Sequence, residues 1–473
     1  MEPEGPPPAP GGTAPRPVGS GDEKRWRLSA QFRSLVRPLS VRDYRLLWGA
    51  QVTSELGDWA TRLALMLVVY RDTRSAALSA LVVTVSLLPW VGLGQVLTTV
   101  VDHFPRRTVM IAADLGRAVV FGVLVLPLPV GALFAGAFLA GLGTAPFESA
   151  RHAVRIEVTD DSDLYGGALT LFSLTGQITT LIGFALGGAL VAVVGARAAF
   201  GLNAASFVAS ACFVAAMRTR SVGRIESSRR RAHLAAAIRF LLDDPIVRWC
   251  STLSMSTAFA GMGIEAIAAV YGRGHPAEVT LLAIAVPIGT LVAAALVPHA
   301  GRDRRLLRAA GLLPVLGGAA GLVAFALSRG SLAGVIGFAA SGIGIAVPVP
   351  AGPVVAMRLR PEVRAPAFSV LQGVTIGCLA AGAAIGGVLA GMFGAVPTCA
   401  AACGALLLVG VAASARLPDA VRPAHGRRRV RGSHLAPGPS SEGLAGERAA
   451  WERTSSRERR RGVTADPATP LHL

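Results

Sequence analysis

The sequence predicts an all-α integral membrane protein in which twelve transmembrane helices form two pseudo-symmetric six-helix bundles. The composition is 52% hydrophobic and only 16% charged. Its apolar residues gather in twelve long runs, and a glycine pattern repeats between two of them. A soluble protein would carry about a quarter charged residues and would not arrange its apolar residues in such runs.

Each apolar run has the length that a bilayer requires. A helix rises ~1.5 Å per residue, so about twenty residues cross the ~30 Å hydrocarbon core. Several runs are separated by only a few residues, which is typical of tight helical hairpins. The predicted spans are 46–70, 78–101, 108–127, 129–147, 166–194, 197–217, 246–271, 279–298, 306–327, 331–350, 367–392 and 394–415.

The runs divide the chain into five parts. Residues 1–45 begin Pro/Gly-rich and become basic, so we expect a disordered N-terminal tail. Residues 46–217 and 246–415 hold six spans each. The linker 218–245 carries an apolar stripe at helical spacing in its second half, which predicts an amphipathic helix at the membrane surface. Residues 416–473 are polar, arginine-rich and expected to be disordered.

The positive charges predict the orientation. The net charge is +18, and arginine outnumbers lysine 45 to one, a usage typical of a GC-rich bacterium. With twelve spans and an inside N-terminus, 39 of the 46 Lys and Arg residues lie inside and 5 outside, while Arg62 and Arg117 lie within spans. The positive-inside rule therefore places both termini in the cytoplasm of a bacterial plasma-membrane protein. The basic tails then lie near anionic lipid, which is favoured over nucleic-acid binding.

A glycine pattern repeats at an offset of 199 residues. GFALGGAL begins at Gly183 in span five and GAAIGGVL begins at Gly382 in span eleven. The two spans are six apart, so the match indicates two homologous halves, a plan that transporters use. Glycines four residues apart also let helices approach closely. The matched pairs are Gly183 with Gly382, Gly187 with Gly386, and Gly188 with Gly387.

The first span carries three charged residues in its middle. Glu55, Asp58 and Arg62 are spaced i, i+3, i+7, so they share one helical face. An ionisable group at mid-membrane costs roughly 2.5–3.5 kcal/mol on insertion scales. These side chains must therefore face protein or a wet cavity.

A charged motif joins spans two and three. Asp102, Arg106 and Arg107 lie in the loop, and Asp114 and Arg117 follow in span three. The loop resembles the G-x-x-x-D-R-x-G-R-R signature of the major facilitator superfamily at its Asp and its last two Arg. The runs TSELGDW and DLGR and the loop ARHAVRIEVTDDSDL are similar to those of the macrolide-efflux and enterobactin-exporter branch.

The resemblance covers about residues 40–415 and implies the major facilitator fold, with export of drug-like compounds. It further implies that Asp102 docks against the cytoplasmic end of span eleven and that Arg106 and Arg107 brace a cytoplasmic gate. The alternative is that Arg106 and Arg107 only help to set the membrane topology and have no role in a gate. Asp114 and Arg117, at i and i+3, are expected to form a structural pair of this gate.

The intramembrane charges admit several roles. Asp58 and Arg62 either form a structural ion pair, or Asp58 carries a proton under the influence of Arg62. Glu55 is a candidate for the substrate path. Span seven is the equivalent of span one and carries Glu265, which either lines the same cavity or lies at the outer interface.

Enzyme and pump motifs are missing from the sequence. It has no G-x-x-x-x-G-K-[ST] phosphate loop, no HExxH and no G-x-S-x-G, and Cys399 and Cys403 lack nearby His or carboxylate partners for a metal. We therefore expect no enzyme activity, cofactor or metal. The prediction is a monomeric secondary transporter that exports a small amphipathic or hydrophobic compound in exchange for protons. The alternatives are a proton-symport nutrient importer and a non-transporting or lipid-moving relative.

Overall fold

The computed structural model of the chain contains only helices among the residues it describes, without any strand. Nine of these helices are long and apolar enough to cross a membrane. The prediction of an all-helical membrane fold is therefore confirmed. The described residues fall in one compact unit, Met1–Val421. They are 36–91, 104–159, 162–219, 227–297, 303–327 and 330–417.

Several predictions fall on residues outside the described ranges. These are Asp102, almost all of the two terminal tails, and the first part of the linker after residue 219. The described part of the linker forms α9 (Ser227–Asp243), as the apolar stripe predicts.

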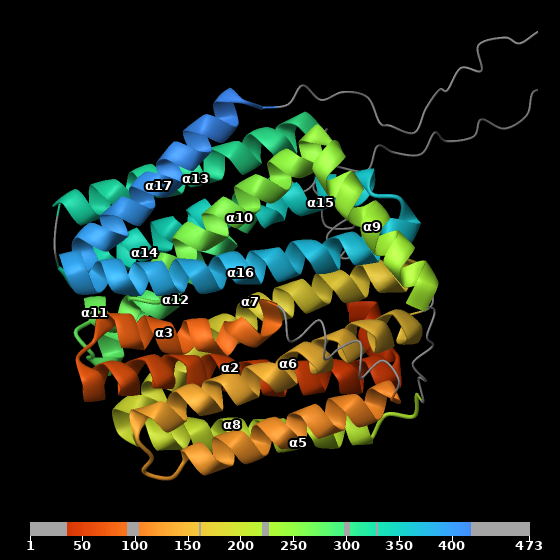
Figure 1. Cartoon of the computed structure of the whole chain (residues 1–473), viewed down its shortest axis with the longest axis horizontal. Helices are drawn as coiled ribbons and strands as arrows, with labels where there is room; N and C mark the ends of the chain where they lie inside the picture. The colour runs from red at the N-terminus through yellow and green to blue at the C-terminus, as the bar shows by residue number, and fades with distance from the viewer. Residues whose placement is uncertain are drawn as a thin grey trace, which may run out of the picture. The chain divides into compact units, whose positions relative to one another are not determined.

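The first six predicted spans correspond to six helices (Figure 1). The second of them stops early, at Leu87, and continues into the 3-10 turn η2 (Leu88–Val91). The rest of that predicted span is outside the described residues. The six helices are α2 (Arg42–Thr73), α3 (Ala76–Leu87), α5 (Arg106–Leu124), α6 (Val130–Val158), α7 (Ser162–Val193) and α8 (Ala196–Ala215).

The last six predicted spans form eight helices because two of them are interrupted. Span seven breaks directly after Glu265, and span ten breaks at Ala346, just before Pro348. Pro348 has no backbone N–H to donate to the carbonyl oxygen four residues earlier, which accounts for the second break. The helices are α10 (Pro245–Glu265), α11 (Ala268–Tyr271), α12 (Pro276–Leu296), α13 (Asp303–Leu327), α14 (Ser331–Ile345), α15 (Pro348–Arg358), α16 (Pro361–Phe393) and α17 (Ala395–Ala415).

Some predicted boundaries are wrong because hydropathy and helical structure end at different places. The fourth span was expected to end at residue 147, but α6 continues to Val158 through Glu148, Arg151 and Arg155. Charged residues end an apolar run without interrupting the backbone hydrogen bonds of a helix. This extension decides the composition of the candidate site.

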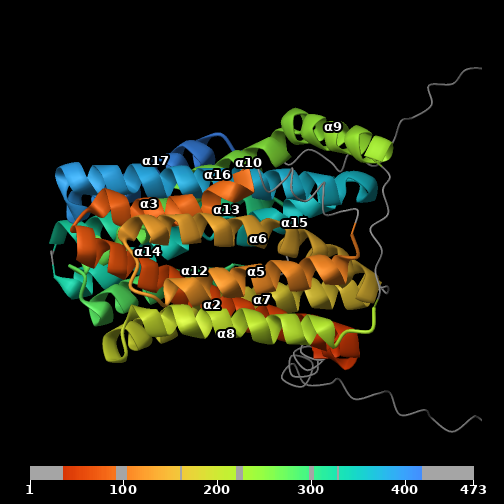
Figure 2. The ribbon, with the colours of Figure 1, turned by 60° about the horizontal axis from the view of Figure 1, so that its bottom comes forward.

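Helix contacts follow a repeated pattern. In the first six spans α2 packs against α7 and α8, and α5 packs against α8. In the last six α10 packs against α16 and α17, and α13 packs against α17. Between the two sets, α3 lies beside α16 and α7 beside α12 (Figures 1 and 2). The helices that join the two sets are thus the second, fifth, eighth and eleventh spans.

The repeated glycines lie at the closest of these crossings. A Cβ at Gly187 would stand 2.5 Å from the carbonyl oxygen of Ala60 on α2, and a Cβ at Gly386 would stand 2.6 Å from that of Gly263 on α10. Gly183 and Gly382 also face α2 and α10, at Trp59 and Phe259. The third pair faces across the two sets: Gly188 meets Thr280 of α12, and Gly387 meets Ala80 of α3.

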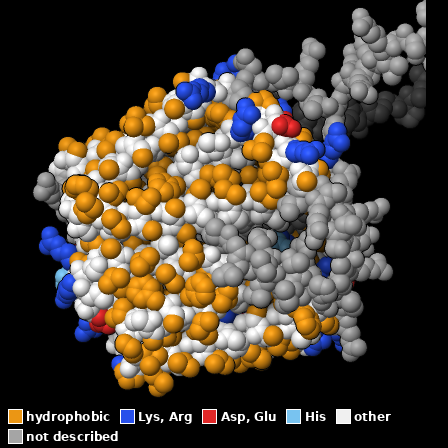
Figure 3. Space-filling view, in the orientation of Figure 1, with side chains coloured by type: hydrophobic (Ala, Val, Ile, Leu, Met, Phe, Trp, Pro, Cys, Tyr) orange, Lys and Arg blue, Asp and Glu red, His pale blue; other side chains and the backbone are white. Residues whose placement is uncertain are grey.

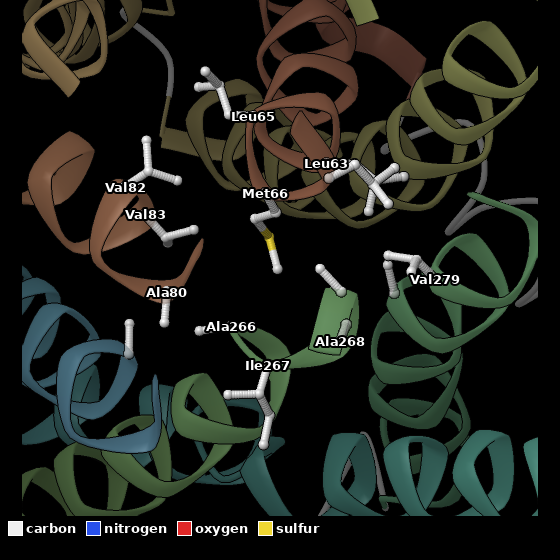
Figure 4. Packing of buried hydrophobic residues seen from close by; sticks show 14 of the residues in the cluster. Leu63, Leu65, Met66, Ala80, Val82, Val83, Ala266, Ile267, Ala268 and Val279 are labelled. Atoms are coloured by element: carbon white, nitrogen blue, oxygen red, sulfur yellow. The ribbon is translucent and has the colours of Figure 1, made fainter. Parts of the chain in front are cut away.

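An apolar core lies where the two sets meet near the C-terminal end of α2. Figure 4 shows Met66 of α2 pointing toward Ala80 of α3 and the segment Ala266–Ala268, while Leu63 lies on the side of Val279 of α12. All of these residues are buried. The break in span seven is therefore enclosed by apolar packing contributed by both sets of helices.

The surface is that of a membrane protein. On the face seen in Figure 3, hydrophobic side chains cover most of the area, and charged side chains gather toward its edges. Such a continuous apolar surface suits lipid. Helix α9 packs against α16 and α10 through Ala237 and Leu241, while Ile238 and Leu242 are exposed.

Candidate functional site

The charged residues of α2 lie at its centre. Asp58 has sixteen helical residues before it and fifteen after it in Arg42–Thr73. Its side chain is nevertheless 41% exposed. A partly exposed carboxylate at the middle of a spanning helix meets the condition for an ionisable group in a membrane, which is contact with protein partners and with water.

Asp58 of α2 belongs to a triad with Arg117 and Asp114 of α5. Arg117 of α5 places Nη1 3.7 Å from Oδ2 of Asp58, and its Nη2 donates to Oδ1 of Asp114 one turn earlier. Asn203 of α8 donates to the other oxygen of Asp58 at 3.4 Å. Arg117 is 3% exposed and Asp114 is 0% exposed. One buried guanidinium therefore serves two carboxylates.

Glu55 belongs to a second triad of the same design. Arg151 of α6 places Nη1 3.3 Å from Oε1 of Glu55, and its Nη2 lies 2.5 Å from Glu148 one turn earlier. Thr179 of α7 donates its hydroxyl to Oε2 of Glu55 at 2.8 Å. The Arg151 side chain is 4% exposed. Each acid on this face of α2 thus receives an arginine from a different helix.

The ion pair of Asp58 with Arg62, one of the alternatives that the sequence leaves open, is not formed. Arg62 instead lies over the ring of Trp59, with Cζ 4.3 Å from the ring centroid. The cation–π contact one turn back along the same helix turns Arg62 away, and Arg117 takes the position beside Asp58. Asp114 and Arg117 do pair, as their spacing predicts, but inside this central cluster.

Arg62 of α2 and Glu265 of α10 attract each other electrostatically. Within the described ranges neither forms an ion pair shorter than 4.0 Å. Glu265 is the last residue of α10 and immediately precedes the helix break. It thus lies beside the apolar core shared by the two sets of helices.

The two arginines of the predicted gate lie at the start of α5. Arg106 lies 3.6 Å from Glu157 at the end of α6, and both side chains are partly exposed. Arg107 donates to the carbonyl oxygen of Ala215 at the end of α8. Both arginines therefore connect the start of α5 to neighbouring helix ends.

Asp43 and Asp244 hold the starts of α2 and α10. Asp43 accepts hydrogen bonds from the backbone amides of Arg218 and Thr219 and from the Thr219 hydroxyl. Asp43 precedes the predicted span, which begins at residue 46. Burial of its carboxyl acts to raise its pKa, but these hydrogen bonds outweigh burial, so the pKa lies below its ordinary value. Asp244 caps α10 and lies 3.1 Å from Arg358 of α15.

The sequence-based reasoning missed Glu148, Arg151, Thr179 and Asn203. The two α6 residues were assigned to a loop, because the apolar run ends at Phe147. Their signal was present: Glu148, Arg151 and Arg155 repeat the i, i+3, i+7 spacing of the charges on α2. Thr179 and Asn203 carry no comparable signal, since single hydroxyls and amides are common in apolar helices.

This architecture defines a class. A polytopic helical chain with titratable groups held at the middle of its helices has features typical of a membrane transport protein. A family model described as Major Facilitator Superfamily matches residues 47–372. The chain therefore belongs to this superfamily and is a secondary transporter.

Individual relatives are distant. The chain is 26% identical over 166 residues to the uncharacterized MFS-type transporter YfiS of Bacillus subtilis (strain 168), a match that covers 35% of this chain and 40% of that protein. The chain thus matches less than half of that relative's length.

Solved structures share the fold. A bacterial homologue of the human lysosomal transporter Spinster, in an inward-facing and unoccupied conformation, aligns with a TM-score of 0.59 at 15% identity, over 79% of this chain and 94% of that one. The peptide transporter POT aligns with a TM-score of 0.60 at 13% identity, over 79% of this chain and 93% of that one. The nucleoside transporter NupG aligns with a TM-score of 0.58 at 13% identity, over 79% of this chain and 98% of that one. At these identities the likeness shows the fold alone.

Proposed function

We propose that this chain exports a small amphipathic or hydrophobic compound from a bacterial cell in exchange for protons. The observation that supports this function is the Asp58–Arg117–Asp114 triad at the middle of the α2 and α5 spans. A carboxylate that is 41% exposed and also bonded to a buried arginine can gain a proton from water and release it to the other side.

The proposal includes alternating access between two halves, residues 46–217 and 246–415. The glycines at the α7–α12 and α3–α16 crossings support it, because close smooth packing lets helices of the two halves slide. The direction of transport rests only on the resemblance to an efflux branch. A proton that crosses 100 mV releases about 2.3 kcal/mol, which sustains a useful gradient.

Proton-coupled uptake is the second candidate. The same acids would load protons outside and release them inside together with a nutrient, and the fold is shared with a peptide transporter and a nucleoside transporter. A chain that moves lipid, or moves nothing, is the third. The charge cluster favours transport, because a buried network with a partly exposed carboxylate has no evident purpose in a static protein.

Expression in a host that lacks its own efflux pumps separates these functions. Raised tolerance to a panel of toxic amphipathic compounds, abolished by an uncoupler of the proton gradient, supports export. Increased accumulation of labelled peptides or nucleosides overturns export in favour of uptake. Unchanged tolerance and unchanged accumulation, with the protein present in the membrane, overturn both.

A further inference from the structure

We propose that Glu55, Arg151 and Glu148 form a second proton-binding site, separate from the Asp58–Arg117–Asp114 triad, so that the protein loads two protons. The inference rests on the proposed function for the role of the first triad. It concerns a site that the sequence-based prediction did not contain, since two of its three members were assigned to a loop.

The two triads have the same construction. Each contains an acid and an arginine three residues apart on one helix, Asp114 with Arg117 on α5 and Glu148 with Arg151 on α6. Each arginine reaches across to an acid on α2. The two α2 acids are themselves three residues apart. A single face of α2 therefore presents one carboxylate to each of two neighbouring helices.

The charge balance of each triad calls for a proton. One guanidinium and two carboxylates sum to −1 when all three are ionised. Both arginines are almost fully buried, and a net charge inside a membrane protein is costly. A proton on one carboxylate cancels it and keeps the ion pair with the other. Two acids that share one site behave in this way elsewhere.

The groups around the second triad are neutral partners of Glu55, His152 beside Glu148, and one further cation, Arg155, one turn later on α6. Thr179 of α7 and Gln51 of α2 are neutral partners of Glu55. His152 has Nε2 3.9 Å from Glu148, while its Nδ1 is occupied by Arg155. Arg155 is the next cation along α6, and its guanidinium stacks on Phe172 at 4.4 Å.

The groups around the first triad are equally defined. Asn203 of α8 is a neutral donor to Asp58, and Arg62 on α2 and Glu148 on α6 act on Asp58 electrostatically. Buried polar atoms are also left over in both triads. Nε of Arg117, Nε of Arg151 and Oδ2 of Asp114 have no hydrogen-bond partner among the described residues.

An aromatic ring separates the two sites. The Cζ atoms of Arg117 and Arg151 lie 4.7 Å and 5.8 Å from the centroid of Phe147. Each arginine also has a ring of its own, Phe207 for Arg117 at 4.1 Å and Phe172 for Arg151 at 4.7 Å. No ion pair within 4.0 Å connects the triads among the described residues. In their direct contacts the two triads are therefore separate, and Glu148 acts on Asp58 only through space.

Protonation is measured on the purified full chain without any transported compound. The stretch of protonated carboxyls is followed by infrared spectroscopy as the pH is raised, and proton release is counted with an indicator dye in weak buffer. The variants are Asp58→Asn, Glu55→Gln and Glu148→Gln, with Glu278→Gln of α12 as a control acid outside both triads. Retention volume and helix content confirm folding.

The wild type should show two carboxyl bands that titrate apart from the exposed acids, and each single variant should release one proton fewer than the wild type. Glu55→Gln and Glu148→Gln should each remove the same band and one proton, because either change leaves a neutral ion pair with Arg151. Asp58→Asn should remove only the other band. Arg151→Gln should strengthen the protonated signal, because both acids lose the cation that favours their ionised form.

A signal that Asp58→Asn abolishes and both glutamate variants leave intact overturns the second site. Loss of both bands in every triad variant also overturns it, since the acids would then form one site. Two independent bands in a protein whose transport ignores the proton gradient support the second site while overturning the proposed coupling.

Discussion

Arg151 of α6 lies 3.3 Å from the carboxylate of Glu55 on α2, although 96 positions separate them in the chain. The pair closes the contact between two helices that otherwise touch little. Arg151 also holds Glu148 and stacks on Phe172. A single buried guanidinium thus fixes α6 against α2 and α7.

We therefore expect Arg151→Gln to destabilise the protein strongly. Glu55 and Glu148, which are largely buried, would lose their cation, and breaking a buried pair in this way costs about 3–5 kcal/mol. The loss should shrink at low pH, where the acids accept protons. Thermal or denaturant unfolding in detergent measures it.

Arg106→Gln is the matched control, because Arg106 forms an ion pair with Glu157 at the partly exposed start of α5. Exposed pairs contribute about 0–1 kcal/mol. Equal destabilisation by the two variants would show that burial does not determine how much Arg151 contributes to the free energy of unfolding.

Asp58→Asn should abolish proton-coupled transport while the protein still inserts and folds. The amide cannot carry a proton, yet it can still accept from Asn203 and Arg117. Proton flux into reconstituted vesicles, driven by a compound that the wild type confers tolerance to, is the measurement. Full flux in the variant would remove Asp58 from the coupling mechanism.

Sequence reasoning predicted the fold far better than the site. Helix count, fold and glycine repeat follow from local patterns: run length, hydropathy and spacing. Glu55 and Asp58 were identifiable because charge inside an apolar run is costly wherever it packs. Their partners depend on which helices touch, and sequence spacing contains no such information.

The choice of partner for Asp58, which the sequence leaves open, illustrates the limit. An i, i+4 spacing permits a pair, and Arg62 nevertheless stacks on Trp59 while Arg117 arrives from α5. Tertiary packing places the buried Arg117, which also binds Asp114, beside Asp58. Only the arrangement of α2, α5 and α8 decides between these partners.

Asp43→Asn should lower stability at neutral pH by about 2 kcal/mol, the value of hydrogen bonds to a charged group. Asp43 binds the segment after α8 through the backbone amides of Arg218 and Thr219. Its pKa is below the ordinary value in the folded state, so the stabilisation is full above the unfolded pKa. It is lost as the pH falls through the folded pKa.

Unfolding curves of wild type and Asp43→Asn at a series of pH values test this. The two curves should converge in acid, where Asp43 is protonated. If the difference in the free energy of unfolding stays constant from neutral to acidic pH, the effect comes from packing of the side chain and not from its charge.

Gly387→Val should block transport, because Gly387 of α16 meets Ala80 of α3 at the crossing between the two sets of helices. A larger side chain there forces the helices apart and costs about 1–3 kcal/mol of packing. Gly391, one turn later on the same helix, has open space around the position of a Cβ. Gly391→Val therefore makes the same chemical change in the same helix without the contact. Vesicle transport and thermal unfolding of the two variants should separate them clearly, with Gly391→Val close to wild type. If the two variants transport equally well, the α3–α16 crossing does not need close packing, and the role assigned to the glycine repeat fails with it.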